Sequence, residues 1–232
     1  MRQVVLDTET TGLDFRLGDR VIEIGCVELR NRTLTGQRFH RYVNPEREVE
    51  AGALAVHGLS NEFLHDKPKF GEIAAEFLDF IQGAELVIHN AAFDLGFLDN
   101  ELALLTAPPI GQACQGVVDT LKLARELHPG RRNSLDALCE RYAINNSGRT
   151  LHGALLDAEL LAEVYLAMTR GQESLIIEID AAPAPEGPQA EHAAPRSLRV
   201  LRASADELAE HARVLAEIQR ESGGRCLWAA HE

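Results

Sequence analysis

The sequence predicts an α/β protein in which helices pack on both faces of a mixed β-sheet, followed by a small C-terminal segment. Three candidate strands follow one another near the start of the chain, and the pattern then changes to alternating strand and helix. Hydrophobic residues make up 45% and charged residues 25% of the chain, as is usual for a globular protein. A stretch rich in proline and alanine at 180–196 then separates the body from the tail.

The first strands are predicted from short apolar runs and from alternation of apolar and polar residues. Residues 4–6 form a short apolar run, and residues 21–29 alternate as a strand does. A third candidate strand at 37–43 follows a predicted turn at 31–36. Strands in such quick succession favour an antiparallel meander.

The helices and the remaining strands follow from the change in hydrophobic period. Apolar residues at 70, 73, 74, 77, 78 and 81 have helical spacing and predict a helix over 70–81. A buried strand is predicted at 86–88 and a short one near 117–118. Further helices are expected at 93–105, 120–127, 134–142 and 153–168.

Charge and cysteine content narrow the possible functions. With 23 basic and 36 acidic residues the net charge is −13, so the chain is not expected to hold duplex DNA by neutralising phosphates. The cysteines at 26, 114, 139 and 226 are widely spaced without a CxxC pair, which predicts a reduced, cytoplasmic location. No apolar run approaches the ~18 residues that span a bilayer, and an acid at position 7 argues against a signal peptide.

Two acids stand at the end of the first strand. Because strand side chains repeat every second residue, Asp7 and Glu9 project from the same face. Carboxylates this close repel each other unless a cation lies between them, and Mg²⁺ and Mn²⁺ prefer such oxygen ligands. The pair predicts a metal site, with a solvated strand end as the alternative.

A third acid follows the strand predicted at 86–88. Asn90 can cap the next helix, and Asp94 then falls in its first turn, where the helix dipole favours an acid. The pattern is therefore compatible either with a functional carboxylate or with ordinary helix capping.

The last pair is His152 and Asp157, at the start of a late helix. A spacing of five turns about 140° on a continuous helix, so the two side chains share a site only if His152 lies in the preceding loop. Gly153 makes that loop plausible. The alternative is an unrelated surface histidine.

Taken in order, these motifs resemble those of the DEDD exonuclease superfamily, which has a ribonuclease-H-like fold. The histidine five residues before the last acid is typical of its His branch. The segments DTETTG, HNAAFD, RNSLDAL and RTLHGALLDAELLAEVYLA resemble the proofreading epsilon-subunit family of bacterial DNA polymerase III. The likeness runs through nearly the whole body and, more weakly, into the tail.

The resemblance implies hydrolysis of phosphodiester bonds with two divalent cations, Mg²⁺ or Mn²⁺. Asp7 is expected to bridge the ions, Glu9 and Asp157 to complete the first site, and Asp94 to support the second. His152 is expected to be the general base, because imidazole is largely neutral at neutral pH and can accept a proton.

Substrate contacts are also implied by the resemblance. Thr10 and neighbouring amides are expected to hold the terminal 3′ hydroxyl, His57 to stack on the last base, and Asn90 to contact the substrate. His57 as a plain turn residue and Asn90 as a plain helix cap remain alternatives. Arg131 and Arg132, next to a probable cap at Asn133–Ser134, are candidates for contact with phosphate.

The resemblance divides the chain into functional segments. Residues 1–171 are expected to form the exonuclease domain, 180–196 a flexible linker and 197–232 a polymerase-binding segment for the alpha subunit. Apolar residues of a predicted helix in the tail would supply that contact, because so short a segment cannot bury a core alone. A theta-like small subunit is a further possible partner of the body.

A short motif follows the body at 172–177. Gln172, Leu175, Ile176 and Ile177 resemble a peptide that binds the beta sliding clamp, whereas a terminal strand or helix end is the alternative.

The predicted function is therefore proofreading of single-stranded 3′ DNA ends, releasing nucleoside 5′-monophosphates. An exonuclease acting on RNA ends is the nearest alternative. A non-catalytic scaffold between clamp and polymerase is a second, against which the complete set of four acids and a histidine argues.

Overall fold

The computed structural model describes residues 1–148, 151–170, 203–224 and 228. The chain divides into two compact units, Met1–Ile176 and Ile177–Glu232, and each is described by itself. Among the described residues, no helix is long and apolar enough to cross a membrane.

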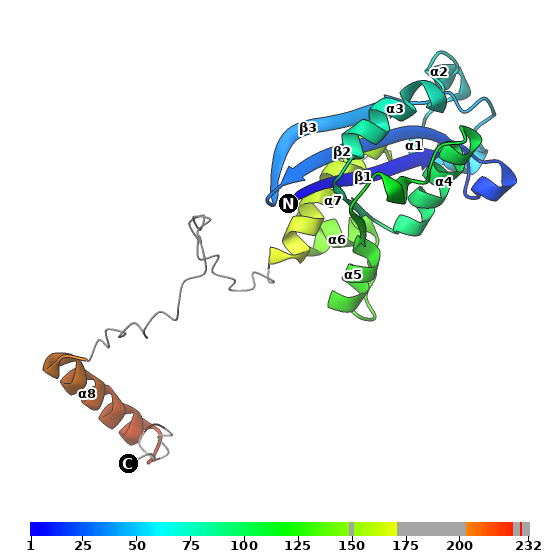
Figure 1. Cartoon of the computed structure of the whole chain (residues 1–232). Helices are drawn as coiled ribbons and strands as arrows, with labels where there is room; N and C mark the ends of the chain where they lie inside the picture. Colours follow the sequence, from blue (N-terminus) through cyan, green and yellow to red (C-terminus); the bar gives the residue numbers. More distant parts are fainter. Residues whose placement is uncertain (149–150, 171–202, 225–227, 229–232) are drawn as a thin grey trace, which may run out of the picture. The chain divides into compact units, whose positions relative to one another are not determined.

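The first unit is built on a five-stranded mixed sheet with the order β3-β2-β1-β4-β5 (Figure 1). The strands are β1 Arg2–Thr10, β2 Val21–Arg30, β3 Thr33–Tyr42, β4 Glu85–Ile88 and β5 Gly116–Asp119. The three strands β3, β2 and β1 are antiparallel to one another, whereas β4 and β5 run parallel to β1. The carboxyl ends of β1, β4 and β5 therefore meet at one edge of the sheet, where the loops that follow them can form a shared site.

Helices cover both faces of this sheet, as predicted. They are α1 Ala51–His57, α2 Asn61–His65, α3 Phe70–Ile81, α4 Ala91–Leu104, α5 Thr120–Leu127, α6 Leu135–Arg141 and α7 Ala154–Met168. Short 3-10 turns stand at Phe15–Leu17 and Ile110–Gln112.

Two hydrophobic cores lie on the two faces, and β1 contributes to both. Val4 and Leu6 face the core formed with α3 and α4, whereas Val5 faces the core formed with α5, α6 and α7. This alternation follows from the two-residue repeat of a strand and leaves β1 buried on both sides. The acids at the end of β1 are thus carried by the central strand of the sheet.

Several predicted elements are confirmed at residue level. Helix α3 has the bounds predicted from its apolar spacing, α5 has the bounds expected for it, and α6, α7 and β2 agree within one residue. Cys139 and Tyr142 pack with Leu135 and Leu138 in the core, as their spacing indicated.

Two predictions near β3 are wrong in their bounds. The turn expected over 31–36 is confined to Asn31 and Arg32, and β3 begins at Thr33 rather than at 37. Backbone pairing of Arg30 with Thr33 and of Leu29 with Leu34 extends the hairpin through polar residues that resemble a loop. Helices α1 and α2 were not predicted, because α1 is short and its N-cap residue Glu50 makes no side-chain cap bond.

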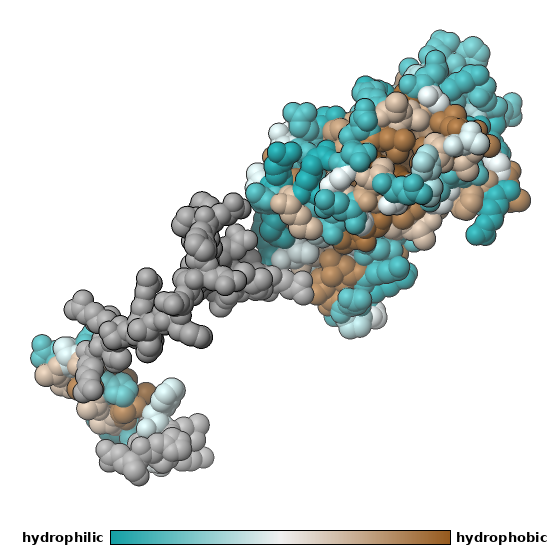
Figure 2. Space-filling model, viewed as in Figure 1, coloured by the Kyte–Doolittle hydropathy of each residue, from teal (hydrophilic) through white to brown (hydrophobic). Residues whose placement is uncertain are grey.

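The second unit contains helix α8, Ala205–Glu221. Ser204 and Glu207 exchange hydrogen bonds at its first turn and form a capping box. Helix α8 has no buried residue, and Figure 2 shows apolar residues at its surface. The predicted clamp peptide at 172–177 and the linker at 180–196 lie outside the described residues.

Candidate active site

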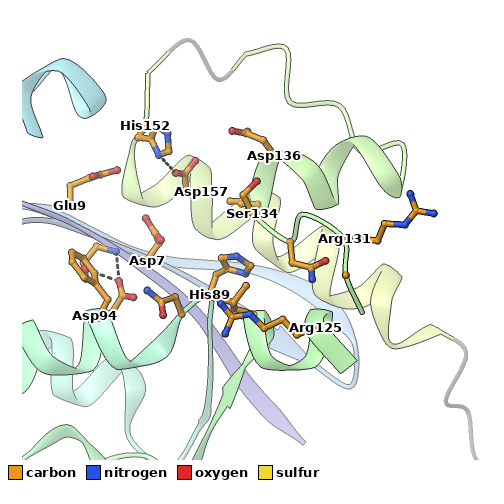
Figure 3. Close-up of a pocket in the computed structure, with 17 residues that line it drawn as sticks. Asp7, Glu9, His89, Asp94, Arg125, Arg131, Ser134, Asp136, His152 and Asp157 are labelled. Carbon is orange, nitrogen blue, oxygen red and sulfur yellow. Dashed lines mark hydrogen bonds and ion pairs between the residues drawn. The ribbon is translucent and has the colours of Figure 1, made fainter. Parts of the chain in front are cut away.

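A cavity of about 760 Å³ opens at the carboxyl ends of the parallel strands (Figure 3). It brings together all five residues that the sequence singled out for chemistry. They are Asp7 and Glu9 from β1, Asp94 from α4, and His152 and Asp157 from the start of α7. Side chains more than 140 positions apart in the chain thus share one cavity.

The position of Asp7 and Glu9 follows from the register of β1. Asp7 stands opposite Gly25 on β2, and the register shifts between Glu9 and Thr10. Such an irregularity bends the strand end and re-aims the side chains that follow it. Both acids line the cavity, as does Thr8 between them, so their common face stays a prediction.

Gly25 allows helix α7 to approach these acids closely. A Cβ atom at position 25 would lie 2.2 Å from the backbone carbon of Ala154 and 2.2 Å from the backbone nitrogen of Leu155. Any larger residue at position 25 would therefore push the first turn of α7 away from the sheet. Because Asp157 stands in that turn, this glycine positions Asp157 next to β1.

His152 lies in the loop before α7, as the spacing argument required. Its backbone N–H donates to the carbonyl of Val56 at 3.1 Å, which ties the loop to the end of α1. Its Nδ1 lies 3.2 Å from Oδ2 of Asp157. Glu9, His152 and Asp157 each offer a ligand atom within 4.8 Å of the others. His152 is partly exposed, whereas Asp157 is buried.

Asp94 is enclosed and held by two donors that the sequence analysis missed. Thr8 donates to its Oδ1 from the backbone N–H at 3.1 Å and from the hydroxyl at 2.7 Å. Burial raises the pKa of Asp94 to about 7, against the opposing effect of the Thr8 donors. The two-residue repeat of a strand places Thr8 on the opposite face from Asp7 and Glu9. This alternation could have indicated that Thr8 has a hydrogen-bond partner of its own.

Asn90 does not act as the predicted helix cap. It occupies the N-cap position of α4 but adopts a left-handed conformation, with φ 66°, and makes no side-chain cap bond. A non-glycine residue in this region is uncommon and carries strain. Its side chain lines the cavity beside His89.

A second cavity of about 320 Å³ adjoins the first, and both are lined by Thr8, Glu9 and Phe93. It is also lined by Thr10 and His57. The Thr10 hydroxyl donates to the carbonyl of Gly12 at 2.6 Å.

His57 is the last residue of helix α1, before the left-handed C-cap Gly58, and it is buried. Its Nδ1 accepts a hydrogen bond from the N–H of Leu59 at 3.0 Å, and its Nε2 has no hydrogen-bond partner among the described residues. Burial lowers the pKa of His57, which favours the neutral ring with its proton on Nε2.

Comparisons with known proteins agree with this geometry. The family model described as "Exonuclease" matches residues 4–165. DNA polymerase III subunit epsilon of Escherichia coli K12 is 52% identical over 241 residues, covering 99% of this chain and 98% of that protein.

The chain belongs to the epsilon-subunit family of exonucleases. It is a 3′→5′ exonuclease of the proofreading type, and the predicted family and function are confirmed. Exonucleases of this family normally use divalent metal ions.

Solved structures confirm the predicted ribonuclease-H-like fold. Exonuclease X in complex with 5′ overhanging duplex DNA has a TM-score of 0.58 and 26% identity, covering 73% of this chain and 92% of that one. The nuclease domain of 3′hExo, a DEDDh family member bound to rAMP, has a TM-score of 0.64, covering 74% of this chain and 92% of that one. At 18% identity, the second likeness concerns the fold alone.

Proposed function

We propose that Asp7, Glu9, Asp94 and Asp157 hold two divalent cations, Mg²⁺ or Mn²⁺, for phosphodiester hydrolysis. The donor set fits this role, because oxygen ligands of this kind suit hard cations. Burial raises the pKa of Asp94 to about 7, and a bound cation would favour its ionised form. When bound, such cations would supply Lewis acidity and neutralise phosphate charge.

His152 acts in this proposal as the general base, accepting the proton of the attacking water. The single observation that carries the assignment is its placement, partly exposed and with Nδ1 3.2 Å from Oδ2 of Asp157. The carboxylate orients the ring, while the exposed part of the imidazole can reach solvent.

The smaller cavity is the proposed site of the 3′-terminal nucleoside. Its lining contains Thr10 and His57, two of the three residues expected to contact substrate, and it meets the acidic cavity at Glu9. His57 Nε2 lies near the backbone of Thr10 but has no well-formed hydrogen bond among the described residues, and a ligand acceptor there would satisfy it. Asn90, on the side of the acidic cavity, is the third proposed contact.

The partners are proposed from the named relative and from α8. Since the likeness to the E. coli epsilon subunit covers 99% of this chain, we assign residues 1–171 to catalysis and 197–232 to binding of the polymerase alpha subunit. Leu208, Val214 and Ile218 are exposed on α8, as expected of a helix that packs against a partner.

Two further contacts, of residues 172–177 with the beta clamp and of the body with a theta-like subunit, rest on the family alone. The cytoplasmic location is proposed on the same basis.

The test uses the full chain with Mg²⁺ and a primer that carries a mismatched 3′ end. Release of 5′-monophosphates from that end, faster than from a paired end and abolished by EDTA, is expected. An RNA end of the same sequence serves as the comparison, and preference for RNA would contradict the assignment. Co-purification of polymerase with the full chain, lost on deletion of 181–232, tests the tail.

A further inference from the structure

Opposite the acids, the wall of the active-site cavity carries positive charge. Arg125 from α5 and Arg131 from the loop before α6 line the same cavity, and Figure 3 shows them on the side away from Glu9 and His152. Arg125 acts electrostatically on a residue of this cavity. Burial lowers the pKa of His89, and the positive charge of Arg125 lowers it further.

Many basic side chains of the body lie against acids. Ion pairs of that kind join Arg20 to Glu101, Arg47 to Asp19, Arg38 to Glu159, Lys69 to Glu46 and Arg41 to Glu76. By contrast, Arg125, Arg131 and Arg132 are exposed and form no ion pair with an acid in the described part of the chain. In a chain with a net charge of −13, unpaired cations gathered beside one cavity need an explanation.

A further arginine, Arg141, holds in place the loop that carries Arg131 and Arg132. Arg141 donates to Oδ1 of Asn133 at 3.1 Å and to the carbonyl of Arg132 at 2.7 Å. Arg141 therefore has a structural role, and it fixes the backbone from which Arg131 and Arg132 project outward.

A second hollow continues from the active-site cavity at this point. Its volume is about 550 Å³, and its lining includes Arg131, Arg132 and Arg141. Gly130 and Arg131 line both hollows, so the two are adjacent. A strand whose end occupies the acidic side can therefore continue past Arg125 and Arg131 into this hollow.

We infer that Arg125 and Arg131 bind the internucleotide phosphates immediately 5′ of the scissile phosphate, and that Arg132 extends this track. The guanidinium group suits phosphate oxygens and keeps its charge at any working pH. Because the contacts are made to the backbone, they hold any sequence equally. The inference rests on the proposed placement of the terminal nucleotide.

The test measures KM and kcat of the full chain on a short oligothymidylate with Mg²⁺, for Arg125→Gln, Arg131→Gln and the double variant. Each single change is expected to raise KM roughly fivefold, the upper range for an exposed ion pair. A second substrate carries a neutral methylphosphonate at the first or second linkage 5′ of the scissile one. This replacement should raise KM for the wild-type chain. It should raise KM little further in the double variant, because the two arginines proposed to contact these phosphates are already replaced.

Binding of a labelled oligothymidylate with Ca²⁺ in place of Mg²⁺ gives a readout independent of cleavage. The slope of log affinity against log salt should fall by ~0.7 for each lost phosphate contact with a single strand. Lys122→Gln is the matched control, because Lys122 lies on the same helix, carries the same charge and lines neither hollow.

Two results would overturn the inference: an equal rise in KM for Lys122→Gln, or a methylphosphonate penalty that is the same in the wild-type chain and the double variant. Either leaves the proposed function intact if the wild-type chain degrades the oligonucleotide. A wild-type chain that neither binds nor cleaves it contradicts the proposed function itself.

Discussion

The two walls of the active-site cavity carry opposite charge and are built differently. Asp94 and Asp157 on the acidic wall are each 3% exposed, on helices packed against the sheet. Arg125 and Arg131 on the opposite wall are exposed, one on a short helix and one in a loop. Carboxylates that would hold metal ions need fixed positions. Arginines that would bind a flexible nucleic-acid backbone can adjust their conformation. In this account, a strongly acidic chain binds a polyanion by placing acidic and basic side chains on opposite walls of one cavity.

The largest expected effect comes from removing a carboxylate of the acidic wall. Asp157→Asn keeps the shape but removes a proposed ligand, and we expect kcat to fall roughly 10⁴-fold, because metal ions supply several kcal/mol of charge stabilisation. Single-turnover cleavage of a mismatched primer measures this. Asp136→Asn, in the same cavity but outside the proposed ligand set, should cost less than about tenfold. Similar losses in both variants would show that only the total negative charge matters.

Replacing the proposed base comes next. His152→Ala should lower kcat by roughly 10²–10⁴-fold, the usual share of general base catalysis. The dependence of its residual rate on pH should differ from that of the wild-type chain. An unchanged rate would remove His152 from the mechanism.

The sequence predicted the acidic wall better than the basic one, for a physical reason. Asp7 and Glu9 are related by strand alternation, and His152 and Asp157 by the start of a helix, so local rules brought each pair together. Arg125 could not be assigned in this way, because its place in the cavity depends on how α5 packs at the sheet edge. Arg131 was noted only as a candidate for phosphate contact.

The missed features share a dependence on tertiary contacts. Thr8 gains its role only when α4 brings Asp94 to β1. The left-handed backbone of Asn90 replaced the expected cap. Among the helices, strong apolar spacing predicted α3 to the residue, whereas the short helix α1 lacks a side-chain cap.

Gly25→Ala tests how exactly the acidic wall must be placed. The new Cβ would overlap the backbone of Ala154, and we expect a loss of about 1–3 kcal/mol in the free energy of unfolding. The displaced Asp157 should also lower kcat roughly tenfold. Gly116→Ala is the control, because a Cβ there has no atom within 4 Å. If Gly25→Ala melts and cleaves like the wild type, close approach of α7 is unimportant.

A smaller effect concerns the stability of the acidic wall without metal. The folded pKa of Asp94 is about 7, above its unfolded value of ~3.9, so the wild-type chain loses stability as pH rises between these values. Asp94→Asn has no carboxylate to ionise at this position, so it should not lose stability over this pH range. Its melting temperature in EDTA should exceed that of the wild type by a margin that widens from pH 5 to pH 7 and then stays constant.

Added Mn²⁺ should narrow that margin, because a bound cation favours the ionised carboxylate of the wild-type chain. A margin independent of pH and of metal would show that Asp94 is ionised and compensated within the protein itself.

Direct titration of Mn²⁺ into the full chain tests the central claim most sharply. Glu9, His152 and Asp157 lie close enough for His152 itself to be a metal ligand. Variants of His152 and Asp157 therefore distinguish a metal ligand from a general base. We predict about two Mn²⁺ per chain for the wild type and for inactive His152→Gln, and fewer for Asp157→Asn. A wild-type chain that binds no Mn²⁺, or a His152→Gln variant that loses it, would contradict an acidic metal site served by a histidine base.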